Sequence, residues 1–255
     1  MSNAVQIEEP QVYKAVLKAV KAKKKGLARL FLGKVTMEDA LDLKELRLEH
    51  ITVRNLDFLN YFPNLERLTL ESVKELQSIE GIANCTGLKN LACYETRIDD
   101  FTPLLSCREL EYFDYMIEGE DMSPCRSDFD FLKEFPNLQC IDLTGNLVED
   151  VTFLGECKAM EQLILDNNPV TSIAPLKMAP KLNWLEVQNG KLTSLDDIAE
   201  FQALECLFVK SNAFGADEIE EYRKKFSYLK ILELEESDTE NSLKQINKML
   251  DEGTL

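Results

Sequence analysis

The chain has 255 residues, of which 45% are hydrophobic, and a formal net charge of −17 at pH 7. The hydrophobic content is ordinary for a globular protein, and no apolar run approaches the roughly 18 residues of a membrane-spanning helix. An acidic body of this kind repels phosphate backbones, which argues against nucleic acid as a partner.

The charge is unevenly distributed. Residues 1–34 carry eight basic and two acidic side chains, a net charge of +6, which leaves −23 for the remainder. The run Lys23–Lys25 is interpreted as a solvated helix face, although it suits contact with an anionic surface. Ser2, Asn3 and Ala4 are typical of a vector-derived leader, so the absence of a signal peptide is a weak guide to localisation.

The first predicted element is a helix over about residues 11–24, ended by Gly26. A first edge strand is expected after it. Because the end of a repeat stack exposes core, both elements are interpreted as an N-terminal cap. The helix has an apolar stripe of Val12, Val16 and Val20, and the strand contains Leu27, Leu30 and Leu32.

From residue 43 onward one phrase recurs nine times: a hydrophobic residue, two others, a hydrophobic residue, one other, and a hydrophobic residue. Its clearest copies begin 22 residues apart. A fixed period of roughly 20–29 residues with this spacing is typical of leucine-rich repeats. Because strand side chains alternate, positions 4 and 6 of each repeat should point inward, and positions 3, 5 and 7 outward. The copies begin at Leu43, Leu65, Leu88, Leu110, Leu138, Met160, Leu182, Leu204 and Leu229.

Other positions in the repeat predict the remaining core and a side-chain ladder. Position 9 holds Asn146, Asn168 and Asn212, where an asparagine typically satisfies the turn backbone, so the ladder should be regular in the second half and irregular in the first. Positions 11, 14 and 17 should be buried. They hold Val148, Val151, Leu154, Val170, Ile173, Leu176, Leu192, Leu195 and Ile198.

Three repeats depart from the common length. The repeat at Leu65 has 23 residues, which displaces Leu76 and its successors by one. The repeat at Leu110 has 28 residues, and its acidic insertion near residues 118–128 is expected to protrude as a loop. The repeat at Leu204 has 25 residues, and residues 217–226 read as a true helix, acidic first and basic last.

The last predicted element is a C-terminal capping helix. Leu243, Ile246 and Leu250 form its apolar stripe, Asp238 or Ser237 is its expected N-cap, and Gly253 its stop. Both terminal helices are interpreted as lids rather than as partner-binding elements.

The stretch Leu165–Leu176 resembles the 22-residue repeats of bacterial internalins and is similar to those of the phosphatase-1 regulatory leucine-rich-repeat subunit. Its Ile-x-Pro-Leu sequence recurs in variant form at Phe101–Leu104. The resemblance covers about residues 43–236. It implies an α/β solenoid with a curved parallel sheet on its concave face, short convex segments and a bacterial source. The expected organisation is residues 1–42 as N-terminal helix and cap strand, 43–236 as about nine repeats, and 237–255 as capping helix.

The residues give little sign of chemistry. Cys85, Cys107 and Cys157 share a core position, so buried thiols are expected rather than a Cys85–Cys107 bridge, and the seven cysteines suggest a reducing compartment. Phosphate-binding, CxxC and HExxH motifs are absent, and His50 is the one histidine. The sequence therefore predicts a non-enzyme with no cofactor and no metal.

The outward strand positions are the remaining candidate site. An apolar patch of Ile164, Trp184, Cys206, Phe208 and Ile231 is expected in solvent, beside a mixed patch nearer the middle. Asp114 and Asp142 are predicted neighbours in one column, and Glu49 and Glu71 in another; such like charges favour a cationic partner. The candidate partner-binding residues are Tyr94, Tyr112, Asp114, Met116, Asp142, Ile164, Trp184, Glu186 and Phe208.

These patterns favour a protein-interaction module whose partner has a basic patch and an apolar anchor. Two alternatives stay open: a regulatory subunit of an enzyme such as a phosphatase, and a secreted or surface factor that engages host proteins. We expect a cytoplasmic monomer, with secretion as the alternative localisation and weak self-association allowed by the apolar patch.

Overall fold

In the computed structural model, which describes residues 4–24, 33–118 and 125–254, each copy of the repeated phrase forms a short strand. The strands are parallel and follow one another in chain order, β1 to β9. Equivalent residues of successive repeats pair, as Leu46 does with Leu68 and Leu68 with Leu91. The predicted leucine-rich-repeat solenoid is confirmed. The predicted Leu27–Leu32 strand and most of the acidic insertion lie outside the described residues.

The chain divides into two compact units. The first comprises residues 1–125 and 134–138, and the second comprises residues 126–133 and 139–255. The strands of the first unit are β1 (Glu45–Glu49), β2 (Arg67–Glu71), β3 (Asn90–Tyr94) and β4 (Tyr112–Met116). The strands of the second are β5 (Cys140–Asp142), β6 (Gln162–Ile164), β7 (Trp184–Glu186), β8 (Cys206–Phe208) and β9 (Ile231–Glu233).

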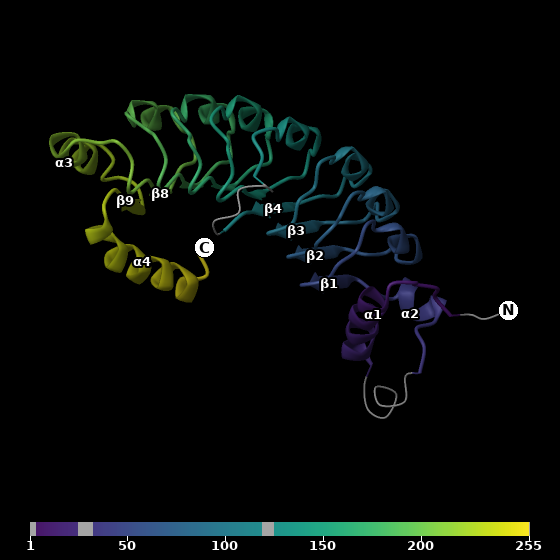
Figure 1. The fold of residues 1–255 in the computed structure, drawn as a ribbon. Coiled ribbons are helices and arrows are strands. Elements are labelled where there is room, and N and C mark those ends of the chain that lie inside the picture. Colours follow the sequence, from purple (N-terminus) through teal and green to yellow (C-terminus); the bar gives the residue numbers. More distant parts are fainter. Residues whose placement is uncertain (1–3, 25–32, 119–124, 255) are drawn as a thin grey trace. The chain divides into compact units, whose positions relative to one another are not determined.

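Within each unit the segments that return between strands form short 3-10 helices on one side of the sheet (Figure 1). After β8 a true helix, α3 (Ala216–Lys225), takes their place, which confirms the prediction for residues 217–226. Glu218 accepts a hydrogen bond from the amide of Gly215 at the start of α3 (2.7 Å). The 3-10 helices are η2 (Asp57–Tyr61), η3 (Glu80–Asn84), η4 (Thr102–Ser106), η5 (Asp130–Glu134), η6 (Thr152–Glu156), η7 (Ala174–Met178) and η8 (Asp196–Glu200).

The core lies between the strands and these returning segments. Positions 4 and 6 are buried except at half-buried Leu232 of β9, as in β1, where Leu46 and Leu48 alternate with exposed residues. The hydrophobic residues predicted at positions 11, 14 and 17 are buried as well. The opposite side of the sheet, which bears positions 3, 5 and 7, is called the open face below.

Asparagine side chains link consecutive turns in the second unit, where Asn168 is buried and Asn212 is half-buried. Asn168 accepts a hydrogen bond from the amide of Val148 (2.9 Å) and donates to the carbonyl oxygens of Leu143 (2.8 Å) and Leu165 (3.1 Å). Asn212 repeats the arrangement, accepting from the amide of Leu192 (2.9 Å). In the first unit a threonine, Thr96, accepts from the amide of Val73 (3.0 Å). The ladder therefore has asparagines in the second half and a substitute in the first, as predicted.

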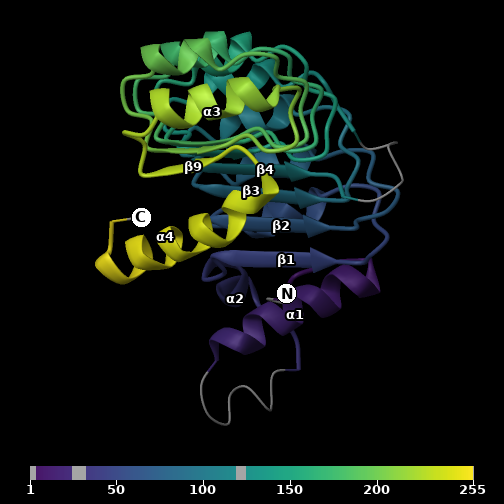
Figure 2. The ribbon, with the colours of Figure 1, turned by 90° about the vertical axis from the view of Figure 1, so that its left-hand side faces the viewer.

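The N-terminal cap of the first unit consists of two helices, α1 (Pro10–Lys23) and α2 (Met37–Leu41). The predicted stripe of Val12, Val16 and Val20 is buried, and α1 packs next to β1 (Figure 2). At α2, Thr36 and Asp39 form a capping box, in which each side chain accepts from the other residue's amide.

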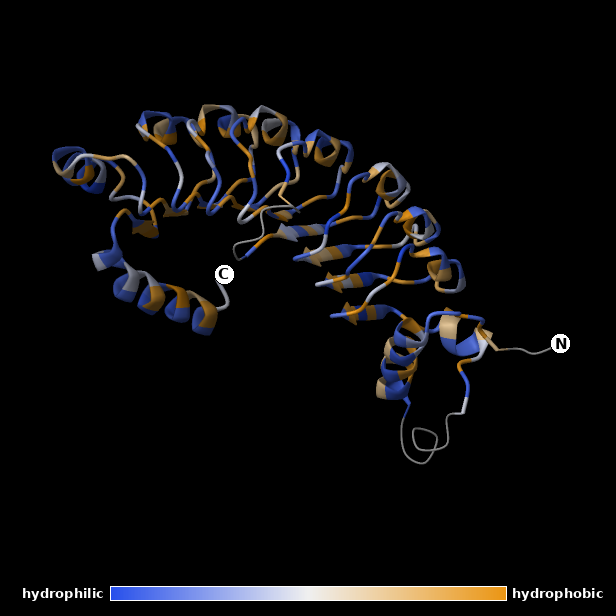
Figure 3. Cartoon of the chain, viewed as in Figure 1, coloured by the Kyte–Doolittle hydropathy of each residue, from blue (hydrophilic) through white to orange (hydrophobic). Residues whose placement is uncertain are grey.

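The C-terminal helix α4 (Thr239–Glu252) follows the short 3-10 turn η9 (Glu236–Asp238) and ends at Gly253, whose φ is +64°. Within the second unit it lies on the side of the sheet opposite the 3-10 helices (Figures 1 and 2), against β9. The predicted stripe is only partly right, because Leu243 and Leu250 are 55% and 56% exposed, whereas Ser242 and Met249 are buried. The helix therefore packs with only part of its apolar side. Figure 3 shows hydrophobic and hydrophilic residues alternating along it.

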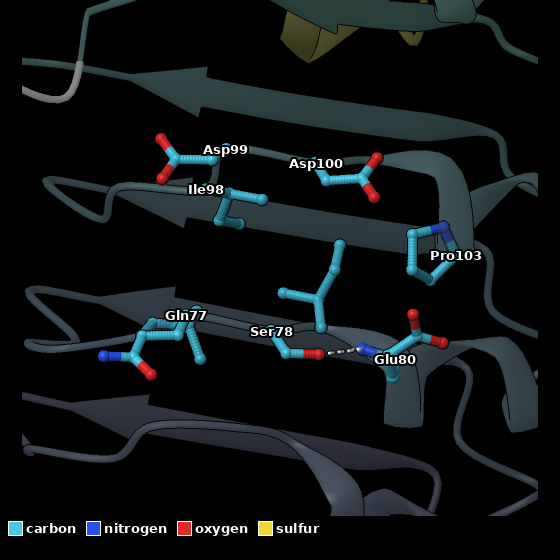
Figure 4. A pocket seen from close by; sticks show the side chains of 9 residues that line it. Gln77, Ser78, Glu80, Ile98, Asp99, Asp100 and Pro103 are labelled. Carbon is cyan, nitrogen blue, oxygen red and sulfur yellow. Dashed lines mark hydrogen bonds between the residues drawn. The ribbon is translucent and has the colours of Figure 1, made fainter.

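The extra residue in the repeat at Leu65 has a local consequence in the first unit. Glu75 adopts a left-handed conformation with φ of 60°, and Leu76 is half-buried rather than in the core. Beside it lies a hollow of about 270 Å³ whose rim includes Ser78, Asp99 and Asp100 (Figure 4). Ser78 accepts a hydrogen bond from the amide of Glu80 there (3.1 Å).

Candidate functional site

The open face of the first unit brings together the residues predicted for its mixed patch. Strands β3 and β4 pair Asn90 with Tyr112, Ala92 with Asp114, and Tyr94 with Met116. The hydroxyl of Tyr94 donates to a carboxylate oxygen of Asp114 (3.3 Å). Tyr112 is 38% exposed, and Met116 is half-buried. An aromatic ring, a thioether and a carboxylate are thus presented on one face of the first unit.

A hollow of about 340 Å³ adjoins this patch at the carboxyl ends of β2, β3 and β4. Tyr94 and Met116 supply its apolar wall. Carboxylates surround it, and the strands end there because Ser72 and Glu95 turn the chain with φ of 49° and 48°. Its lining consists of Glu71, Ser72, Tyr94, Glu95, Met116 and Glu118.

On β1 and β2 an arginine neutralises part of the negative charge of the predicted carboxylate column. Glu49 and Glu71 are paired in the sheet register, as expected. Arg47 forms ion pairs with both of them, so this column is not a row of uncompensated negative charge. The sequence reading missed this pairing because it compared residues only within one column, whereas Arg47 belongs to the neighbouring one.

The open face of the second unit carries three carboxylates on consecutive strands. Asp142 and Glu186 flank Ile164 in the register of β5, β6 and β7, and Asp166 follows β6. The expected proximity of Asp114 to Asp142 involves residues of different units and stays a prediction. The amide nitrogen of Gln188 donates to both Asp166 (2.8 Å) and Glu186 (3.1 Å), which ties two of the carboxylates together.

Burial and neighbouring negative charges raise the pKa values of two of these carboxylates, Asp166 and Glu186. The pKa of Glu186 is raised to about 7, mainly by burial and in part by the charges of Asp166 and Asp142, while hydrogen bonds from Trp184 and Gln188 oppose the rise. Burial likewise raises the pKa of Asp166 to about 6. Near neutral pH this face therefore carries a negative charge that changes with pH.

The prediction that the apolar patch is exposed to solvent is wrong. Cys206, Phe208 and Ile231 are buried, at 2%, 5% and 0% exposed, because Met249 of α4 packs on them together with half-buried Ile246. Trp184 is half-buried beside them: its ring lies 4.8 Å from that of Phe208, and its Nε1 donates to Glu186 (2.6 Å). Ile164 is also half-buried. Whether Trp184 and Phe208 bind a partner stays a prediction.

Three of the cysteine thiols are placed for packing in the core rather than for nucleophilic attack. Cys85, Cys107 and Cys157 are buried free thiols, as expected, and burial raises the pKa of each to about 12. The thiolate is the reactive form of cysteine, so these residues are poor nucleophiles at neutral pH. His50 is exposed, with Nε2 lying 3.7 Å from a carboxylate oxygen of Glu71.

Among the residues of the three described ranges, no three His, Cys, Asp or Glu side chains converge as metal ligands. In the same ranges, no helix has the length and apolar content needed to cross a membrane.

Comparison with protein-family models and with curated proteins gives no match. Among solved structures, internalin C2 of Listeria monocytogenes is similar with a TM-score of 0.55 and 20% identity, over 79% of this chain and 93% of that one. A leucine-rich-repeat protein of Leptospira interrogans is similar with a TM-score of 0.52 and 22% identity, over 77% of this chain and 62% of that one. Together with the repeat register, these likenesses make the chain an internalin-like leucine-rich-repeat protein in its fold.

Proposed function

We propose that this chain is a non-enzymatic protein-interaction module that binds a protein partner on the open face of its sheet. The observation that carries the proposal is the patch of Tyr94, Tyr112 and Met116 beside the 340 Å³ hollow of the first unit. Aromatic and methionine side chains that combine exposed area with rigid placement are typical centres of protein interfaces. The fold supports this role, because repeat solenoids present extended surfaces to macromolecules.

The chemistry of the partner follows from the charges on the same face. Asp114 in the first unit, and Asp142 and Glu186 in the second, favour lysine or arginine on the partner. An apolar anchor would meet the side chains of the mixed patch. The residues proposed for binding remain Tyr94, Tyr112, Asp114, Met116, Asp142, Ile164, Trp184, Glu186 and Phe208, of which Phe208 is reached only when α4 is displaced.

Replacement of Tyr112 and Met116 by alanine is expected to weaken partner capture at least tenfold, on the order of the 1.4 kcal/mol or more that one interface centre contributes. The measurement is affinity capture from a lysate of the source organism, followed by titration of the captured protein against the wild type and the Tyr112→Ala/Met116→Ala variant. Circular dichroism should show that both proteins fold alike, because both side chains lie outside the core.

The matched control is Tyr228→Ala. Tyr228 is 62% exposed, belongs to the second unit and lies outside the strands, so its removal should leave capture unchanged. Equal retention of the partner by the wild type and the double variant would contradict the proposed site.

The acidic part of the proposal predicts a salt dependence of association. Raising the ionic strength from about 0.02 to about 0.15 M should slow association with the captured partner severalfold, because the screening length shortens to about 8 Å. Stopped-flow or surface-based kinetics would measure the association rate. An association rate that does not change with salt would contradict the proposed basic patch on the partner, but not the proposed apolar anchor.

A further inference from the structure

Helix α4 occupies a surface that the repeat pattern would otherwise leave exposed. The side chains of positions 3 and 5 on β8 and β9 include Cys206, Phe208 and Ile231, and all three are buried under α4. In β8 all three strand residues are buried, whereas in β6 an inward residue alternates with exposed and half-buried ones. The open face of β7–β9 therefore has an apolar patch, covered by a helix, beside the carboxylates of Glu186 and Glu233.

The contact between α4 and this surface is narrow. Of its fourteen residues only Ser242 and Met249 are buried, and Ile246 is half-buried. Leu243 and Leu250, which share the apolar side of the helix, remain more than half exposed. A helix whose role were only to close the core would be expected to bury its whole apolar face.

The start of α4 is fastened separately by polar groups. The hydroxyl of Thr239 donates to the buried carboxylate of Glu233 (3.0 Å), which also pairs with Lys210 (3.1 Å). Asp238 pairs with Arg223 of α3 (2.8 Å) and accepts the amide of Leu234 (3.0 Å). These contacts fix the N-terminal end of the helix. Beyond this first turn, the contacts of the helix with the apolar cluster of the sheet come from Ile246 and Met249.

We infer that α4 is a displaceable latch, and that the surface beneath it is a docking site for an amphipathic helix of the protein partner. An amphipathic helix is the expected occupant because α4, which is itself amphipathic, already lies over Trp184, Phe208 and Ile231 with one apolar flank against the sheet. Such recognition is a common use of an apolar groove. The inference rests on the proposed function of the open face as the binding side, and it adds that the chain masks part of this face itself.

The test uses the full chain and a labelled synthetic peptide with the sequence of residues 239–254. Met249→Asp should release α4, and the emission of Trp184, the one tryptophan of the chain, should shift to the red. The peptide should then bind the variant at least tenfold more tightly than the wild type in fluorescence anisotropy. The matched control is Leu250→Asp, one residue along the helix and 56% exposed, which should leave both readouts at wild-type values.

Hydrogen exchange of the wild-type chain is a second test of whether α4 is displaced, and it needs no variant. Amides of α4 beyond its first turn should exchange at least tenfold faster than those of β7 and β8, because the helix opens without the sheet. Equal protection of α4 and the strands, failure of the peptide to bind the Met249→Asp variant, or collapse of the strands in that variant would each overturn the latch. The proposed function would survive that result if Tyr112→Ala/Met116→Ala still lost the partner.

Discussion

Replacement of Asn168 by alanine is expected to lower the free energy of unfolding by about 3 kcal/mol, the cost of a buried hydrogen-bonding group left without its partner. Asn168 is 2% exposed and joins two turns of the second unit. Its loss removes the acceptor of the Val148 amide, which is buried with that residue, and a donor to the carbonyl oxygen of Leu165. Leu143 is less affected, because its carbonyl oxygen also accepts from Asn146 (2.9 Å).

Equilibrium unfolding in urea, followed by circular dichroism, would measure the difference. Asn168→Thr should recover part of the loss, since Thr96 in the first unit fills the equivalent position with one hydroxyl that accepts an amide and donates to a carbonyl oxygen. Asn247→Ala on the exposed side of α4 should change stability by less than about 0.5 kcal/mol. A loss at Asn168 as small as that at Asn247 would show that water replaces the side chain.

The repeat phase was the most predictable feature because it depends on local spacing alone. A leucine at position 4 or 6 has its side chain on the core side of a strand whatever partner the strand meets. Leu46, Leu68 and Leu91 accordingly pair in register, and Asn168 takes the position predicted for the turn ladder. The helix of the repeat at Leu204 was equally clear, since its charges change sign from the first turn to the last.

Exposure on the open face was less predictable, because it depends on which distant segment covers it. Strand alternation correctly placed Phe208 and Ile231 on that face, but nothing local to them indicates that α4 returns to cover it. The stripe of Leu243, Ile246 and Leu250 marked an amphipathic helix without showing which flank would dock. A broad apolar face allows several orientations, and packing on β9 selected the one that buries Met249.

The charges show the same division between local pattern and tertiary setting. The sequence placed Asp142 and Glu186 among the candidate binding residues of the open face, and Asp166 lies beside them. Nothing in the sequence indicated that Gln188 would bridge two of them, or that Trp184 would donate to one of them at 2.6 Å. Those contacts and the burial that accompanies them decide how readily the group ionises.

Ionisation of Glu186 should therefore set part of the pH dependence of stability. Its pKa is raised from an ordinary value of 4.5 to about 7, mainly by burial and in part by the charges of Asp166 and Asp142. A carboxyl whose folded pKa is raised stabilises the fold fully below its ordinary pKa, and this contribution is lost as the pH rises through the folded value. Between pH 4.5 and 7 the second unit should thus lose stability as Glu186 gives up its proton.

Glu186→Gln is expected to raise the free energy of unfolding at pH 8 by on the order of 1–3 kcal/mol and to leave it unchanged near pH 4. The glutamine oxygen can still accept from Trp184, so the variant removes the charge and keeps the contact. Urea unfolding at pH 4, 6 and 8 measures the difference, with Glu149→Gln at an exposed position of the same unit as control. If Glu186→Gln changed stability equally at pH 4 and pH 8, packing rather than ionisation would be the cause, and the open face would carry a charge insensitive to pH.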